Sequence, residues 1–349
     1  MISHLIISNY KSIGIAEFKM RKLTLFSGTN SSGKSSAIQA LLLAVDNIST
    51  SEGERNLRTT YLPVMSFNES RNYITNAKEY GVKIFCGDEN ADMQFLPKDE
   101  QFIATTVRQT GTLPEEVFNQ QKNIFHLSAI RSGDLGSPKM NPNPDSNPLG
   151  NKGEFIIDYY HGHMKEILQP SLVAYNEIKT LEGQVNYWLQ RLTGYTLTVS
   201  SLGSEYLVRY ISAEGKSLHP YNVGTGVNFV AETLIVCLSS RLGSTVIIEN
   251  PEIHLHPSAQ ADMLDFLVAI ANAGIQVIIE SHSDHFFNGI RRSLKTRKID
   301  REDVSVYNFK KESGLTISEE VELSQEGGIM NYIPGMFEQF DIDLDAILM

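Results

Sequence analysis

The feature that most constrains this chain is an unbroken G-x-x-x-x-G-K-[ST] sequence near its start. The apolar residues 23–26 before it predict a strand, and residues 38–45 after it carry apolar side chains at helical spacing. Strand, glycine-rich loop and helix in this order are typical of phosphate binding, because glycines let successive backbone N–H groups curl around phosphate oxygens. We therefore expect an α/β fold with a phosphate loop made of Gly28, Thr29, Asn30, Ser31, Ser32, Gly33, Lys34 and Ser35.

Two side chains of the phosphate loop have the chemistry of nucleotide binding. Lys34 would place a positive charge against the β- and γ-phosphates, and the Ser35 hydroxyl would ligate Mg²⁺. The helix that begins near Lys34 adds the positive end of its dipole. The whole loop, together with Ser36, is a candidate ATP contact.

The loop alone does not distinguish a GTPase, a kinase and an ATPase. Asn151-Lys152-Gly153-Glu154 is close to the guanine-reading N-K-x-D sequence. It lies in a stretch rich in proline and asparagine (137–153) instead of after a buried strand, and it ends in Glu where Asp is needed. The guanine interpretation is therefore disfavoured.

Two later strands end in polar side chains that could complete the site. Residues 245–249 are a β-branched run ending in Glu249, and residues 275–280 are a second buried strand followed by Ser281 and His282. Parallel strands present their carboxyl ends at the edge that also holds the phosphate loop. We expect Glu249 to reach Mg²⁺ through a water molecule, with Glu252 as a second acid and His282 on the γ-phosphate side.

Composition limits the other functions open to the chain of 349 residues. Its 41 acidic and 30 basic residues give a net charge of −11, which argues against a protein that coats nucleic acid non-specifically. Two cysteines exclude a disulfide framework and a four-cysteine zinc site. No apolar run is long enough for a membrane span and no secretory signal is evident, so we expect a cytoplasmic protein.

Several longer motifs carry a resemblance to known proteins. The sequences ENPEIHLHPSAQ (249–260), IIESHSDHFFNGIRR (278–292) and NYKS (9–12) resemble the ABC-type P-loop ATPases of the RecF, SMC and overcoming-lysogenization-defect group. Further stretches are similar to predicted bacterial AAA-labelled ATPases with a short C-terminal extension: FHLSAIRSG (125–133), GNKGEF (150–155), VNYWLQRLTG (185–194) and IPGMFEQFDIDLDAIL (333–348).

This resemblance implies ATP and Mg²⁺ as cofactors and gives roles to individual residues. Glu249 matches the Mg²⁺-side acid and His282 the γ-phosphate-sensing histidine, and Lys11 of NYKS joins the candidate ATP contacts. His254 and His256 fall in the loop that crosses to a partner subunit. The signature loop, which in this group caps the ATP of the other subunit of a homodimer, matches Gly224, Thr225 and Gly226, with Asn228 beside it.

One departure from the group bears on catalysis. Many relatives place a glutamate directly after the Mg²⁺-side acid to polarise the attacking water, and here that position is Asn250. An amide is a poor proton acceptor, so either Glu252 substitutes or turnover is slow.

For the architecture, we expect an ABC-type nucleotide-binding domain with a mixed sheet over residues 1–300. Its core would be 1–45, 120–135 and 205–300, with an insertion at 46–119 and a helical lobe at 136–204. Residues 301–349 would form a C-terminal extension that acts as a small cap. Asp341-Ile342-Asp343 imitates a Toprim nuclease motif, but only eight residues follow Asp341, so an acidic cap is favoured.

The expected function is Mg²⁺-dependent ATP hydrolysis that switches a homodimer or higher oligomer and so controls a separate effector. The resemblance adds bacterial anti-phage defence as the setting. An alternative is an ATP-binding scaffold with little hydrolysis. A DNA-repair ATPase ranks lower and depends on a basic patch that could bind nucleic acid: Arg291, Arg292, Lys295, Arg297 and Lys298. A zinc site at His254, His256, His282 and His285 is disfavoured, because a nucleotide site explains the same positions.

Overall fold

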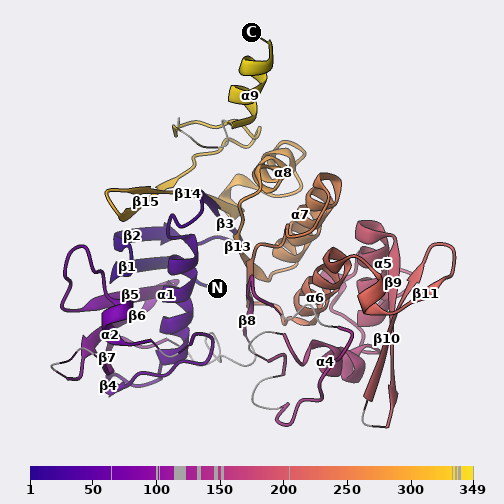
Figure 1. Ribbon diagram of the computed structural model, residues 1–349, viewed down its shortest axis with the longest axis horizontal. Coiled ribbons are helices and arrows are strands. Elements are labelled where there is room, and N and C mark those ends of the chain that lie inside the picture. Colours follow the sequence, from indigo (N-terminus) through magenta and orange to yellow (C-terminus); the bar gives the residue numbers. More distant parts are fainter. Residues whose placement is uncertain are drawn as a thin grey trace.

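The computed structural model describes residues 1–63, 65–99, 101, 103–113, 123–131, 135–144, 148–150, 153–203, 205–331, 333, 334, 336 and 339–348. Asn151 and Lys152 of the N-K-x-D-like stretch lie outside these residues. The described chain forms a mixed twelve-stranded sheet and a three-stranded sheet, with helices packed against them (Figure 1). The predicted α/β class with a mixed sheet is confirmed.

The half of the large sheet that carries the phosphate loop is parallel. Its strands, in order, are β14 (Val304–Glu312), β3 (Leu23–Gly28), β13 (Gln276–Glu280), β12 (Thr245–Glu249) and β8 (Ile124–Leu127). Side chains of β12 alternate between two hydrophobic cores, one on each face of the sheet, which is why its sequence is a continuous apolar run. The register pairs Glu249 with Glu280, so both carboxylates lie at one edge.

The other half of the sheet is largely antiparallel. Its strands, in order, are β4 (Gly53–Asn56), β7 (Thr105–Thr110), β6 (Glu89–Pro97), β5 (Tyr80–Cys86), β1 (His4–Tyr10) and β2 (Ile13–Lys19). The predicted insertion supplies β4 to β7 and the short helix α2 (Phe67–Ser70), and so lengthens the sheet. Helix α1 (Lys34–Asn47), which follows the phosphate loop, packs on β1, β3 and β5.

The C-terminal strands differ from the expectation. β14 and β15 (Leu315–Glu320) form an antiparallel hairpin, in which β14 also pairs with β3 and β15 with β2. Residues 304–320 therefore join the two halves of the large sheet instead of belonging to a separate extension. The physical reason is that residues 304–309 of β14 are buried on both faces, which is the pattern of a strand in the interior of a covered sheet and not of a peripheral extension. Beyond it, α9 (Gln339–Leu348), with Asp341 to Asp343, stands away from the body (Figure 1).

The remaining helices and the small sheet contribute to the hydrophobic core on the face of the large sheet opposite to α1. The helices are α4 (Ile156–His163), α5 (Leu181–Thr193), α6 (Thr225–Ser239), α7 (Pro257–Asn272) and α8 (Asp284–Lys295). The small sheet holds β9 (Tyr195–Leu202), β10 (Glu205–Ser212) and β11 (Ser217–Leu218). Single 3₁₀ turns occupy Pro170–Leu172, Pro220–Asn222 and Arg301–Asp303. No helix in the described part of the chain combines the length and hydrophobicity of a transmembrane span.

Candidate active site

The phosphate loop connects β3 to α1 and packs against the hairpin formed by β14 and β15. Gly28 and Gly33 have φ angles of +135° and +110°, in the region that favours glycine. A Cβ on Gly28 would lie 2.1 Å from the carbonyl oxygen of Phe309, and one on Gly33 would lie 2.1 Å from the hydroxyl of Thr316. The loop therefore needs both glycines for its conformation and for its close packing against β14 and β15.

Lys34 points its ammonium group back into the phosphate loop. It is 2% exposed, and its Nζ donates hydrogen bonds to the carbonyl oxygens of Gly28 (3.0 Å) and Thr29 (2.8 Å). Burial lowers the pKa of Lys34, an effect that the nearby carboxylates of Glu280 and Glu252 oppose. The cation, the loop and two acids thus share one small region, as a triphosphate site requires.

Glu249 is a carboxylate fixed by two donors. Its Oε1 accepts a hydrogen bond from His126 Nε2 and its Oε2 accepts one from the Ala129 N–H, both at 3.0 Å. Burial raises the pKa of Glu249, but the bonds from His126 and Ala129 and the charge of Arg131 outweigh it, so the pKa is lowered overall. Glu249 is therefore held ionised at the end of β12.

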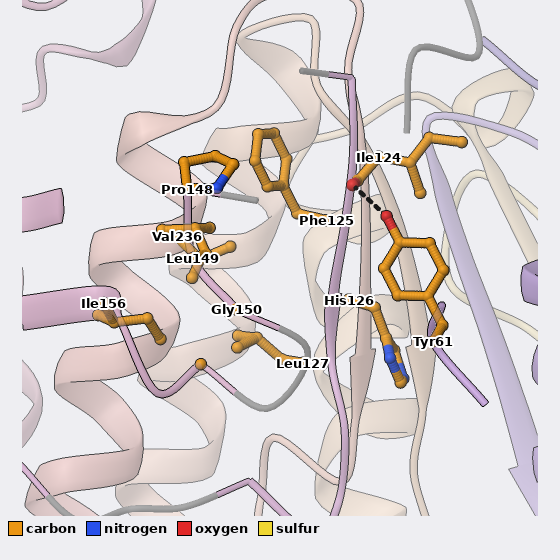
Figure 2. A pocket seen from close by; sticks show the side chains of 11 residues that line it. Tyr61, Ile124, Phe125, His126, Leu127, Pro148, Leu149, Gly150, Ile156 and Val236 are labelled. Atoms are coloured by element: carbon orange, nitrogen blue, oxygen red, sulfur yellow. Dashed lines mark hydrogen bonds between the residues drawn. The ribbon is translucent and has the colours of Figure 1, made fainter. Parts of the chain in front are cut away.

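His126 also lines a small cavity of about 20 Å³ between β8 and the region of α4 and α6. Figure 2 shows His126 and Tyr61 on one side of β8, and Pro148, Leu149 and Ile156 on the other side. The cavity has room for about one water molecule and is far too small for a nucleotide. His126 Nδ1 is buried with no hydrogen-bond partner among the described residues.

Glu280, at the end of β13, is a site residue that the sequence analysis did not assign. It is 3% exposed, and its Oε1 accepts a hydrogen bond of 2.7 Å from the Ser35 hydroxyl. Burial, together with the charges of Glu249 and Glu252, raises its pKa to about 7, against the opposing effects of Ser35 and Lys34. The signal was present, since β12 and β13 end in the same VIIE sequence.

The turn after β12 brings Asn250 and Glu252 to the same edge. Asn250 has a φ of +47°, and its N–H donates to the Glu280 carbonyl at 2.8 Å. Glu252 Oε1 accepts a hydrogen bond of 2.8 Å from the His282 N–H. Burial and the charge of Lys34 lower the pKa of His282, whereas Glu252 opposes the shift. The structure therefore brings His282, Glu252 and Lys34 together, as the motifs predicted.

The residues around Ser35 fit a magnesium ion that also binds a nucleotide. One carboxylate oxygen of Glu280 and one of Glu252 are buried without a hydrogen-bond partner among the described residues. Mg²⁺ prefers such oxygens and is commonly held by one or two carboxylates plus substrate phosphates. Among the described residues, no group of three or more His, Cys, Asp or Glu is arranged to hold a metal ion.

Two of the predicted ATP contacts lie at the margin of this region. Lys11, at the turn between β1 and β2, donates its Nζ to Gln39 on α1, and burial lowers its pKa. It contacts the helix that follows the phosphate loop. Ser36 is half-buried in the first turn of α1.

The signature loop, Gly224–Gly226, lies at the start of α6. Gly224 and Thr225 are exposed, whereas a Cβ on Gly226 would lie 2.6 Å from the His254 carbonyl oxygen. The loop and the turn that contains His254 are therefore in direct contact within one chain. His256, farther along, is exposed and caps α7 by accepting from the Ser258 N–H.

Asn228 requires a correction. It is 5% exposed, and its amide nitrogen donates to the Pro220 carbonyl at 3.4 Å. Asn228 lies near the start of α6 with its side chain directed into the protein. It is therefore not exposed on the surface together with Gly224 and Thr225.

Arg131, which follows β8, links the acids to the signature helix. Its Nη2 donates to the Asn250 carbonyl at 3.3 Å, and its Nε lies 4.0 Å from a carboxylate oxygen of Glu232 on α6. Its guanidinium also lies 4.9 Å from the centre of the Phe229 ring, which stacks on His254. Arg131 therefore contacts both the turn that carries the acids and α6, a role the sequence did not reveal.

Most side chains of the predicted basic patch bind acidic or carbonyl groups of the same chain. Arg292 and Lys298 both bind Asp265, at 2.7 and 2.8 Å, and Arg297 binds Glu326 at 2.8 Å. Arg291 donates to the Gly327 carbonyl. These contacts favour the interpretation of the patch as a structural surface of α8.

Comparison with known proteins identifies the family of the chain. Residues 93–287, more than half of the chain, match the family described as AAA ATPase domain. The chain belongs to this family. The match covers β12, β13 and the signature loop, and the phosphate loop precedes it. Membership supports ATP binding and hydrolysis as the chemistry of the chain. No curated protein sequence matches it.

Two solved structures share the fold. An SMC head bound to the C-winged helix domain of ScpA has a TM-score of 0.60 and 13% identity, and the alignment covers 93% of this chain and 98% of that one. An SMC head domain with an extended coiled coil, bound to the C-terminal domain of ScpA derived from Pyrococcus furiosus, has a TM-score of 0.55 and 12% identity, with 100% and 99% covered. The predicted ABC-type fold of the RecF and SMC group is confirmed.

Proposed function

We propose that this chain binds MgATP at the phosphate loop and hydrolyses it in a site that a second copy completes. The observation that carries the proposal is the meeting of Lys34 with Glu252, Glu280 and His282, contributed by three separate parts of the sequence. These groups have the charges and positions needed to hold a triphosphate and activate water.

Each residue would act mainly by position and charge. Lys34 would exchange its bonds to loop carbonyls for phosphate oxygens, and Ser35 would help to hold Mg²⁺, which would supply further positive charge to the triphosphate. Glu249 would orient water in the outer shell of the ion. Glu252, whose second oxygen is buried without a hydrogen bond to any described residue, is the candidate base because Asn250 cannot take the proton. His282 would sense the γ-phosphate.

The second copy would supply its signature loop. Gly224 and Thr225 are exposed at the N-terminus of the fifteen-residue helix α6, where free N–H groups and the helix dipole favour an anion. A γ-phosphate held by the opposite phosphate loop would be that anion. ATP would then join two copies, and hydrolysis would release them.

Such a switch would control a separate protein, in bacterial anti-phage defence as the motif resemblance implies. The SMC heads with this fold are each bound to part of ScpA, which supports a separate partner for a domain of this shape. Because most of the basic patch is paired internally, nucleic acid is a weaker candidate for that partner.

Asn250 favours a second candidate function, an ATP-binding scaffold with very slow hydrolysis. Single-turnover measurements on Asn250→Glu separate the two. A large gain in rate would identify a switch whose turnover is held low, and an unchanged rate would favour Glu252 as the working base.

The test of the proposed function is Lys34→Ala. Each charged hydrogen bond to phosphate contributes about 1.5–3 kcal/mol, so ATP affinity should fall by about tenfold to a hundredfold. Equilibrium binding of a fluorescent ATP analogue measures the change. Normal ATP hydrolysis by Lys34→Ala would contradict the assignment.

A further inference from the structure

Glu280 differs from the other two acids in what it touches. It is the acid that contacts Ser35, the hydroxyl expected to ligate Mg²⁺, at 2.7 Å. Its other oxygen is buried and makes no hydrogen bond to any described residue, although the side chain is only 3% exposed. A buried carboxylate oxygen without a partner is costly unless a cation or donor satisfies it.

Glu249 has the opposite arrangement. Both of its oxygens are already bound, by His126 and by the Ala129 N–H. A carboxylate held by two donors can orient a water molecule, but it has less capacity left for direct contact with an ion. The two residues are register partners on adjacent strands, so the difference arises from their bonds and not from their depth in the sheet.

We propose that Glu280, together with Ser35, is the direct protein contact of the nucleotide-bound Mg²⁺, and that Glu249 acts behind it as a positioning residue. The inference rests on the proposed function, because the ion would enter with ATP. It deepens that function by giving the metal a carboxylate ligand at the end of β13, two residues before His282.

The experiment measures how much the metal contributes to nucleotide binding. Affinity for a fluorescent, non-hydrolysable ATP analogue is determined in excess EDTA and in saturating Mg²⁺, and the ratio of the two affinities is the metal gain. In Glu280→Gln the gain should fall by about tenfold or more, while binding in EDTA is retained. Glutamine can still accept from Ser35, so the fold should be preserved, which thermal unfolding checks.

Three further variants separate the explanations. Glu249→Gln removes an equal charge from the neighbouring strand end and should reduce the gain less than Glu280→Gln does. Ser35→Ala should reduce it, and the double variant with Glu280→Gln should lose little more, because both would serve one ion. Glu205→Gln, at an exposed strand end in the small sheet, should behave as wild type.

Each outcome bears on one claim. If Glu280→Gln keeps the full metal gain, or loses no more than Glu249→Gln, this inference is wrong while the proposed function stands. If the wild-type chain binds nucleotide without any metal gain, the inference is also wrong. If the wild type binds no nucleotide at all, the proposed function itself fails.

Discussion

At the residue scale, the acids of the site differ in their bonding, and this difference predicts their roles. One oxygen of Glu252 accepts from the His282 N–H, and the other is buried with no hydrogen-bond partner in the part of the chain that the structure describes. Glu252→Gln preserves an acceptor for His282 but removes the base. We expect ATP binding to be retained and the single-turnover rate of hydrolysis to fall by about 10²- to 10⁴-fold. A rate equal to that of the wild type would exclude Glu252 as the base.

Part of the site could be predicted residue by residue. Lys34 and Ser35 stand in a motif whose spacing encodes the loop, and Glu249 and His282 follow apolar runs that end at one sheet edge. Glu280 was missed, although β13 ends in the same VIIE sequence as β12, because no sequence pattern shows that its carboxylate reaches the Ser35 hydroxyl. Asn228 was expected beside the exposed glycines, but its side chain lies on the buried side of α6. The position of a residue in the motif does not determine which side of the helix it occupies.

At the element scale, the start of α6 packs against the turn that contains His254. A Cβ on Gly226 would meet a backbone oxygen at 2.6 Å, whereas one on Gly224 has nothing within 4 Å. Gly226→Ala should therefore lower the free energy of unfolding by about 1–3 kcal/mol. Gly224→Ser adds a Cβ at an N-cap where serine is favoured, and should leave it unchanged or raise it. Chemical denaturation compares them, and equal effects would contradict the packing described.

Asp265 on α7 forms ion pairs with Arg292 near the end of α8 and with Lys298 just after it. Burial raises its pKa, but the hydrogen bonds from Lys298 and Arg292 lower it more, so the pKa is depressed overall. A depressed carboxyl pKa stabilises the fold above the unfolded pKa near 4, and the contribution disappears as pH falls through the folded pKa. Asp265→Asn should cost about 1 kcal/mol at neutral pH, since its partners are half exposed.

The measurement is the free energy of unfolding of wild type and Asp265→Asn from pH 7 down to pH 3. The difference between the two proteins should shrink toward zero at the acidic end. A difference that stays constant with pH would mean that the ion pairs at Asp265 do not contribute as described.

The positions of strands and helices were easier to predict from the sequence than the order in which the strands pair in the sheet. Residues 245–249, 257–272 and 276–280 carry apolar patterns that already specify strand, helix and strand, and the hairpin at 304–320 has a clear turn. That β14 pairs with β3 was not predictable, because a sheet neighbour 281 residues away in sequence is selected by packing and leaves no local pattern.

At the scale of the whole molecule, Arg131 connects the proposed ATP site to the helix that a second copy would contact. It contacts the Asn250 carbonyl on one side and Phe229 and Glu232 of α6 on the other. A shift of the acids on binding MgATP would therefore displace Arg131 and, through it, the helix α6. Under the proposed function, this contact would couple ATP binding in one copy to the surface that it presents to another.

The central claim, that two copies build one ATP site, is tested most directly by mixing two inactive chains. Lys34→Ala has a damaged phosphate loop. Gly224→Asp keeps a favoured N-cap but sets a negative charge where the signature loop would meet phosphate. Mixed dimers of the two would hold one intact site of two, and half of randomly paired dimers are mixed. Mixing equal amounts should therefore restore about a quarter of wild-type ATP hydrolysis; activity no higher than the sum of the separate variants would contradict the account.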